Sequence, residues 1–299
     1  MPNKSIIPIL KLHEEITHPD RAQNLPSCIV KIEDLLLANG KPNMRVVREI
    51  QDRGGLREFL DTSSQIIFSS IIPDLLLERI NLDTYRYLNE EFQPEFYITP
   101  DGPTYSSCEK YSRDQIDLVL ELTAKLMRKF PASTPIGLIK GCNFAQMDFH
   151  SDKLQELGVT QFCLHAGDCL CNAPIFAKDL IVDCGRSLAE KVPDLMIYGV
   201  GSRHYFQRFH YAKSFATNSH YMQTFKHQVI QGATWRSFKG DFTKKIVMKN
   251  FNYLRRLVEL QSDTQELMAW VIDASNNECP DNVAEISSID QRILKILEN

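Results

Sequence analysis

Short apolar runs alternate along the chain with longer segments whose apolar residues recur at helical spacing. The longer segments, residues 114–130, 152–157 and 175–192, repeat apolar positions every three or four residues, as one face of a helix does. Continuous apolar runs are typical of parallel strands, because helices cover both faces of their sheet. The runs are IIFSS (66–70), FYIT (96–99), PIGLIKG (135–141), QFCLHAGD (161–168), DLMIYGVGS (194–202) and AKSFATNS (212–219). The pattern predicts six strands joined by helices.

This alternation is typical of parallel βαβ units. A closed (β/α)8 barrel needs two further strands, which we expect at residues 28–31 or 45–50 and near residues 245–248. A doubly wound open sheet would alternate in the same way, but no Gly-x-Gly-x-x-Gly motif follows the first predicted strand. We therefore expect an α/β protein with a TIM-like barrel. The predicted divisions are an N-terminal extension (1–45), the barrel (46–256) and C-terminal helices (257–299).

Composition fits a globular enzyme or binding protein. The chain has 299 residues, of which 43% are hydrophobic and 24% charged, so disorder, collagen and coiled coil are excluded. No apolar run approaches the ~18 residues of a membrane helix, and the first residues lack the apolar core of a secretory signal. The eight cysteines follow no disulfide framework. We expect a cytoplasmic protein with reduced thiols and no membrane partner.

Positive charge is concentrated in residues 203–256, called the basic window below. It holds eleven Lys and Arg residues against one acid, Asp241, and therefore carries +10 in a chain of net charge −4. Twelve aromatic residues share the window. Basic groups neutralise phosphates and aromatic rings stack on unpaired bases, so the mixture predicts a nucleic-acid surface. The alternative is a solvated basic face with core aromatics. The candidate contacts are Arg203, Arg208, Lys213, Lys226, Arg236, Lys239, Lys244 and Lys245.

In either α/β fold, ligands bind at the C-terminal ends of the strands. The candidates at those ends are Ser69, Ser70, Asp101, Gly102, Lys140, Gly141, Cys142, His165, Gly167, Asp168, Gly199, Gly201, Asn218 and Ser219. Carboxylates there could hold the amide and amine edge of a purine or act as base or nucleophile. Glycines allow a flat ligand to approach the backbone. Cys163 and His165 alternate on one strand and suggest a metal-dependent hydrolase as another hypothesis, although a complete ligand set is not evident.

The order of these strand ends resembles the tRNA-guanine transglycosylase superfamily, and within it the shorter DNA 7-deazaguanine transglycosylases. The resemblance covers about residues 66–235. Its motifs are FYITPD, PIGLIKG, FCLHAGD, YGVGS and FATNSHYMQTFKHQVIQG. It implies a (β/α)8 barrel that exchanges a guanine in a nucleic acid for a 7-deazaguanine base. In this family an aspartate attacks the C1′ carbon of the nucleotide and forms a covalent intermediate.

The resemblance also implies roles for the strand-end residues. Asp101 would hold the Watson–Crick edge of the base, and Gly167 with Asp168 would lie beneath it. The remaining substrate-binding candidates are Lys140, Gly141, His165, Gly199, Gly201 and Ser219. The expected partners are DNA or tRNA and a 7-deazaguanine base, with no cofactor and no metal. A second copy of the chain and companion modification proteins are partners that the sequence leaves open.

The chain departs from the family at the nucleophile. Asn218-Ser219 stands where the family has Asp-Ser, and the neutral Asn cannot form the same ester-like intermediate. The family's zinc-binding cysteines are also missing, because Cys279 is the one cysteine beyond residue 184. The catalytic candidates are therefore Asp101, Asp168 and Asn218. We expect a transglycosylase acting on DNA, with a non-catalytic nucleic-acid-binding paralogue or partner subunit as the alternative.

Overall fold

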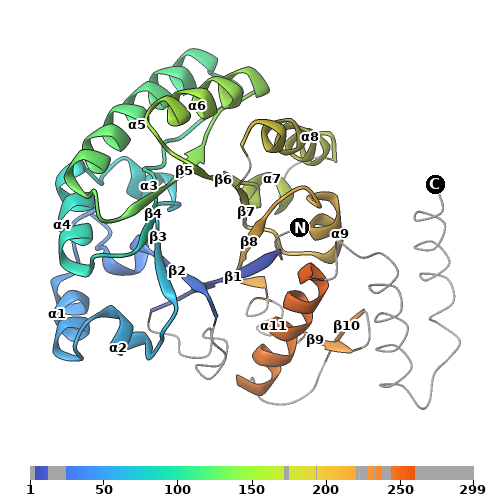
Figure 1. Ribbon diagram of the computed structural model, residues 1–299, viewed down its shortest axis with the longest axis horizontal. Helices are drawn as coiled ribbons and strands as arrows, with labels where there is room; N and C mark the ends of the chain where they lie inside the picture. Colours follow the sequence, from blue (N-terminus) through green and yellow to red (C-terminus); the bar gives the residue numbers. More distant parts are fainter. Residues whose placement is uncertain are drawn as a thin grey trace, which may run out of the picture.

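Eight parallel strands close into a barrel in the computed structural model of the chain (Figure 1). In chain order and in spatial order they are β1 (Ser5–Leu10), β2 (Ser27–Lys31), β3 (Gln65–Ser69), β4 (Phe96–Ile98), β5 (Thr134–Ile139), β6 (Gln161–His165), β7 (Leu195–Tyr198) and β8 (Ser214–Thr217). Closure comes from β1 and β8, which pair in parallel from Ser5–Ser214 to Pro8–Thr217. The predicted TIM-like (β/α)8 class is confirmed.

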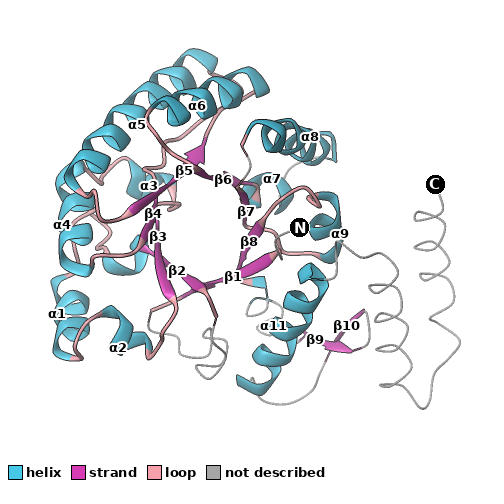
Figure 2. Cartoon of the chain, viewed as in Figure 1, coloured by secondary structure: helices cyan, strands magenta, loops and turns pink. Residues whose placement is uncertain are grey.

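Helices surround the barrel (Figure 2). They are η2 (Ile32–Leu35), α1 (Met44–Asp52), α2 (Leu56–Leu60), α3 (Asp74–Leu77), α4 (Leu82–Phe92), α5 (Glu109–Lys129), α6 (Phe144–Glu156), α7 (Gly167–Cys171), α8 (Ile175–Lys191), α9 (Arg203–Arg208) and α11 (Lys244–Glu259). A separate antiparallel hairpin, β9 (Gln228–Gln231) and β10 (Thr234–Ser237), contacts α11 through β9. The structure describes residues 4–12, 25–171, 175–192, 194–219, 222, 228–231, 234–237 and 244–259.

All six strands predicted from the apolar runs are present, as β3 to β8. Of the places considered for the other two, residues 28–31 lie in β2, whereas residues 45–50 and 245–248 are helical. The remaining strand is β1, so the barrel begins at Ser5 and includes two strands from the predicted extension. The sequence does not indicate β1, because Pro8 has no backbone N–H to donate to a neighbouring strand, and proline is therefore unusual inside a strand.

The apolar run near residue 246 is one face of α11. Its buried residues Val247, Phe251, Leu254 and Val258 recur every three or four positions, which is helical spacing. Of the predicted C-terminal helices, residues 257–259 complete α11 and residues 260–299 lie outside the described residues. In the described part of the chain, no helix has the length and apolarity needed to cross a membrane.

Two apolar layers hold the barrel together. The outer layer, between strands and helices, includes Phe162, Leu164 and Phe215. The inner layer fills the barrel with Ile7, Ile9, Ile29, Ile67, Ile98, Ile136, Leu138, Cys163, Met196, Tyr198 and Ala216. Alternate residues of a strand face the same side. Continuing this alternation to the C-terminal strand ends makes Lys31, Ser69, Lys140, His165 and Asn218 the last inward-facing residues. This end of the barrel is called the mouth below.

Candidate active site

A buried ion pair joins the ends of β4 and β5 at the mouth. The Lys140 Nζ atom lies 2.9 Å from Asp101 Oδ1, and the two side chains are 17% and 4% exposed. The same carboxylate oxygen accepts a hydrogen bond from the Gly102 N–H at 2.7 Å. Removing either partner would leave a poorly solvated charge. The structure thus brings together two residues predicted separately as a catalytic carboxylate and a base contact.

His150 of α6 holds the end of β5 from outside the barrel. The side chain is fully buried, and its Nδ1 atom accepts a hydrogen bond from the Lys140 N–H at 3.0 Å. A neutral ring with an accepting Nδ1 carries its proton on Nε2, and this buried atom has no hydrogen-bond partner among the described residues. Burial lowers the pKa of His150 from 6.5 to about 4, with a smaller contribution from the Lys140 charge. His150 is therefore neutral at pH 7, as its acceptor role requires.

Two ionisable groups belong to the inner layer of the barrel. Cys163 is fully buried, and burial, followed by the Asp101 charge, raises the pKa of its thiol. Tyr198 is 4% exposed and accepts a hydrogen bond from the Ser69 hydroxyl at 3.3 Å. Burial also raises the pKa of Tyr198. Because a reactive cysteine must ionise, Cys163 acts as part of the packed interior rather than as a nucleophile.

Glycines allow the ends of β6 and β7 to approach each other closely. A Cβ atom on Gly199 would lie 2.7 Å from the Gly167 Cα, and Gly199 has a φ of +88°. A side chain at Gly199 would therefore clash and strain the backbone. The His165 ring packs edge-on against Tyr198, with the ring centroids 5.6 Å apart. Gly167 and Gly199 thus allow two loops to pack against each other. The sequence alone cannot distinguish this role from that of glycines that line an open pocket.

The end of β8 is tied to the loop after β7. Thr217 Oγ1 donates to the Val200 carbonyl at 2.6 Å, and Ser219 Oγ donates to the Gly201 carbonyl at 2.7 Å. Asn218 lies between them and is half-buried, and no hydrogen bond of its side-chain amide is recorded among the described residues. Ser219 is therefore a structural brace, whereas Asn218 presents a neutral amide at the mouth.

Two further predicted residues lie in loops and helices at the mouth. A Cβ atom on Gly141 would lie 2.6 Å from the Met147 nitrogen, so this glycine allows the loop after β5 to pack on α6. Asp168 lies in the first turn of α7, and its side chain is outside the described residues.

A second group of charges at the mouth was not among the sequence-based candidates. Lys31 is the last residue of β2, and its Nζ atom lies 2.6 Å from Oε2 of Glu33 in η2. Asp34 Oδ2 accepts a hydrogen bond from the Leu12 N–H at 3.1 Å, and burial raises the pKa of Asp34. The charges of Glu33 and Asp34 also raise the pKa of Tyr198, but less than burial does. The available signal was the run SCIVK followed by acids, the same pattern as at the later strand ends.

Two basic residues of the window whose side chains the structure describes, Arg208 and Lys213, each pair with an acid. Arg208 Nη1 pairs with Asp179 Oδ1 at 2.6 Å. Lys213 Nζ lies 3.7 Å from Asp194 Oδ1, and because Lys213 precedes β8 it lies at the opposite end of the barrel from the mouth. Lys213, which was predicted as a nucleic-acid contact, therefore lies at the end of the barrel away from the strand-end residues. Lys226 and Lys239, and the side chains of Arg203, Arg236, Lys244 and Lys245, lie outside the described residues.

The aromatic residues of the basic window also differ from the prediction. Four of its phenylalanines are fully buried and belong to the core: Phe206, Phe209, Phe215 and Phe251. Tyr211 is partly buried and donates a hydrogen bond to the Val182 carbonyl at 2.6 Å. For these rings the alternative interpretation, core packing, is correct, because composition alone cannot separate a stacking ring from a packed one.

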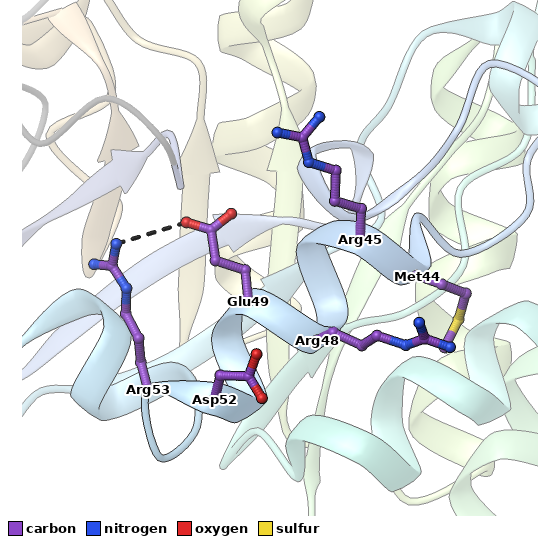
Figure 3. Close-up of a pocket in the computed structure, with 6 residues that line it drawn as sticks. All are labelled: Met44, Arg45, Arg48, Glu49, Asp52 and Arg53. Carbon is purple, nitrogen blue, oxygen red and sulfur yellow. Dashed lines mark ion pairs between the residues drawn. The ribbon is translucent and has the colours of Figure 1, made fainter.

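Two of the cavities that described residues line lie away from the mouth. One, of about 540 Å³, borders α1, and Figure 3 shows its side chains pointing in different directions, with an ion pair between Glu49 and Arg53 at 3.6 Å. Its lining residues are Met44, Arg45, Arg48, Glu49, Asp52 and Arg53. The other, of about 290 Å³, lies at the N-terminal end of the barrel beside Ser5, Ser27 and Lys213. Neither brings candidate catalytic groups together.

No metal-binding set is evident in the part of the chain that the structure describes, where three or more His, Cys, Asp or Glu side chains do not converge. Fold and site together define a TIM barrel whose mouth carries two lysine–carboxylate pairs on different sides. No protein-family model and no curated protein matches the chain.

Proposed function

We propose that the protein is a transglycosylase that exchanges guanine in DNA for a 7-deazaguanine base. The observation that supports this most strongly is the Asp101–Lys140 pair at the mouth of the barrel. The Watson–Crick edge of guanine presents a carbonyl acceptor next to two N–H donors. A lysine can donate to the carbonyl while a carboxylate accepts from the N–H groups. The donor and acceptor groups of the pair therefore complement those of one guanine edge.

The same edge is present in guanine and in 7-deazaguanine, because the two rings differ on the side away from it. One site can consequently hold the departing and the incoming base in turn. When the base binds, contacts to it replace the contact between Lys140 and Asp101. Lys140 turns to the carbonyl of the base, and the Asp101 carboxylate turns to its N–H groups. Adenine and cytosine lack this order of groups on the same edge, so they would leave a charge at the site unpaired.

The target nucleotide must leave the base stack to reach the mouth, as other enzymes that act on bases require. His150 contributes indirectly, because its bond to the Lys140 N–H fixes the backbone that carries the lysine. Asn218 faces the mouth as a neutral amide. A non-catalytic nucleic-acid-binding subunit is the second candidate function, and Asn218 is the residue that favours it.

Mass spectrometry of nucleosides tests the proposal. The protein is incubated with DNA, or with tRNA, and a 7-deazaguanine base, and the nucleic acid is then digested. We expect the modified nucleoside in DNA, and we expect Asp101→Asn to lower its rate of formation by at least about 10²-fold. Asp194→Asn is the matched control, because Asp194 also pairs with a lysine but at the opposite end of the barrel.

The binding-subunit alternative predicts a different result. The wild-type protein would bind DNA in a salt-sensitive manner without forming the modified nucleoside. Asn218→Asp would then gain base exchange if the site had merely lost its carboxylate. If neither protein exchanges bases in DNA or tRNA, the transglycosylase proposal is contradicted.

A further inference from the structure

If the Asp101–Lys140 pair holds the Watson–Crick edge of the base, its position determines where the glycosidic bond must lie. Asp101 and Lys140 follow β4 and β5. In a closed barrel of eight strands in sequential order, β8 and β1 lie across from these two strands, and β2 is next to β1 (Figure 2). A guanine whose Watson–Crick edge contacts the pair has its sugar on the opposite side of the ring. The C1′ carbon therefore points toward the arc formed by β8, β1 and β2.

The described residues of this arc offer few nucleophiles. Asn218 at the end of β8 is a neutral amide, and the hydroxyls of Thr217 and Ser219 donate to backbone carbonyls. The carboxylates that follow β2 are Glu33 and Asp34. Asp34 is held by the Leu12 N–H at 3.1 Å.

Glu33 is partly exposed, and an ion pair orients its carboxylate. Its side chain is 33% exposed, and its Oε2 atom lies 2.6 Å from Lys31 Nζ, which is 28% exposed. Lys31 continues the inward-facing positions of β2 after Ile29. The Glu33 charge also acts on the hydroxyl of Tyr198, which belongs to the inner layer of the barrel. A carboxylate beside an ammonium group at the mouth supplies a nucleophile and an adjacent proton donor.

We propose that Glu33 is the nucleophile of base exchange and that Lys31 is its proton-transfer partner, an inference that rests on the proposed function. A Glu33 oxygen forms a bond to C1′ while the bond from C1′ to N9 of guanine breaks. The electron pair of that bond leaves with guanine, which takes a proton from the Lys31 ammonium. In the second half, the incoming base gives its N9 proton to Lys31 and attacks C1′. Glu33 then leaves as a carboxylate, so charge and protons return to their starting state.

Trapping of the covalent intermediate tests this role. The full-length protein is incubated with guanine-containing DNA, denatured, and analysed for protein–DNA adducts by gel and by peptide mass spectrometry. We expect an ester-linked nucleotide on Glu33 that hydroxylamine removes. Glu33→Gln should lose the adduct and lower exchange by at least about 10³-fold. Glu49→Gln is the matched control, because Glu49 also pairs with a basic residue but on α1.

The outcomes separate this inference from the proposed function. Base exchange by the wild type with full activity of Glu33→Gln, or with an adduct on another residue, overturns the role of Glu33 and leaves the function in place. Absence of both exchange and adduct in the wild type overturns both. A thermal unfolding midpoint for Glu33→Gln close to that of the wild type would show that any lost activity is not a loss of folding. Glu33→Asp retains a carboxylate and should retain part of the adduct.

Discussion

The buried His150 makes the stability of the barrel depend on pH in a way that can be calculated. In the unfolded chain its pKa is 6.5, and in the folded protein it is about 4. Between these values the unfolded state binds a proton that the folded state does not, so stability falls as pH falls. Each unit of pKa difference corresponds to about 1.4 kcal/mol. Between pH 7.5 and pH 5, His150 should therefore remove about 2 kcal/mol from the free energy of unfolding.

The matched variant is His150→Gln, which can still accept the Lys140 N–H but does not titrate. Urea unfolding of both proteins at pH 7.5, 6.5, 5.5 and 5 gives the two pH dependences. All other titrating groups are common to the two proteins, so their contributions cancel in the difference. We expect the wild type to lose about 2 kcal/mol more than His150→Gln over this range. Parallel curves would refute the reasoning and would mean that His150 titrates as an exposed histidine does.

Three other predictions follow from the site. Gly199→Ala should lower the free energy of unfolding by about 1–3 kcal/mol, because the φ of +88° and the nearby Gly167 leave no room for a Cβ atom; an unchanged denaturation midpoint would contradict this. Asp34→Asn should raise the thermal unfolding midpoint at pH 7 but not at pH 3. Burial raises the pKa of Asp34, so ionisation of this carboxyl opposes folding above pH 3.8. A lower midpoint at pH 7 would show instead that the charge is stabilising. Lys213→Ala should leave DNA affinity and its salt dependence unchanged in fluorescence anisotropy, since Lys213 pairs with Asp194 away from the mouth; a smaller salt slope would place DNA at that end.

Much of the fold was predictable because both faces of every barrel strand are buried. That burial produces the apolar runs from which β3 to β8 were predicted. β1 was not predicted, because Pro8 interrupts the pattern of backbone donors, and yet this strand closes the barrel through its pairing with β8. Closure is a property of the whole sheet, so no local sequence signal contains it.

The site was predictable only as a set of strand ends. Asp101 and Lys140 were both candidates, but their contact depends on the register of β4 and β5, which pairs Ile98 with Ile136. Glu33 was absent from the candidates because residues 28–31 were one of two alternative places for a strand, and the residues that follow them were not considered as a strand end. The fully buried phenylalanines of the basic window, such as Phe206, could not be distinguished from stacking rings, because burial depends on the tertiary fold.

Exchange of isotopically labelled guanine would show the proposed transglycosylase activity itself. Replacement of guanine by guanine leaves the DNA chemically unchanged, so the reaction can be followed without knowing which 7-deazaguanine the protein uses. The protein is incubated with DNA and ¹⁵N-labelled guanine, and the deoxyguanosine from the digested DNA is analysed by mass spectrometry. We expect label in deoxyguanosine with the wild type and its loss in Asp101→Asn. Absence of label with the wild type, at protein concentrations that saturate the DNA, would show that the protein does not exchange guanine in DNA.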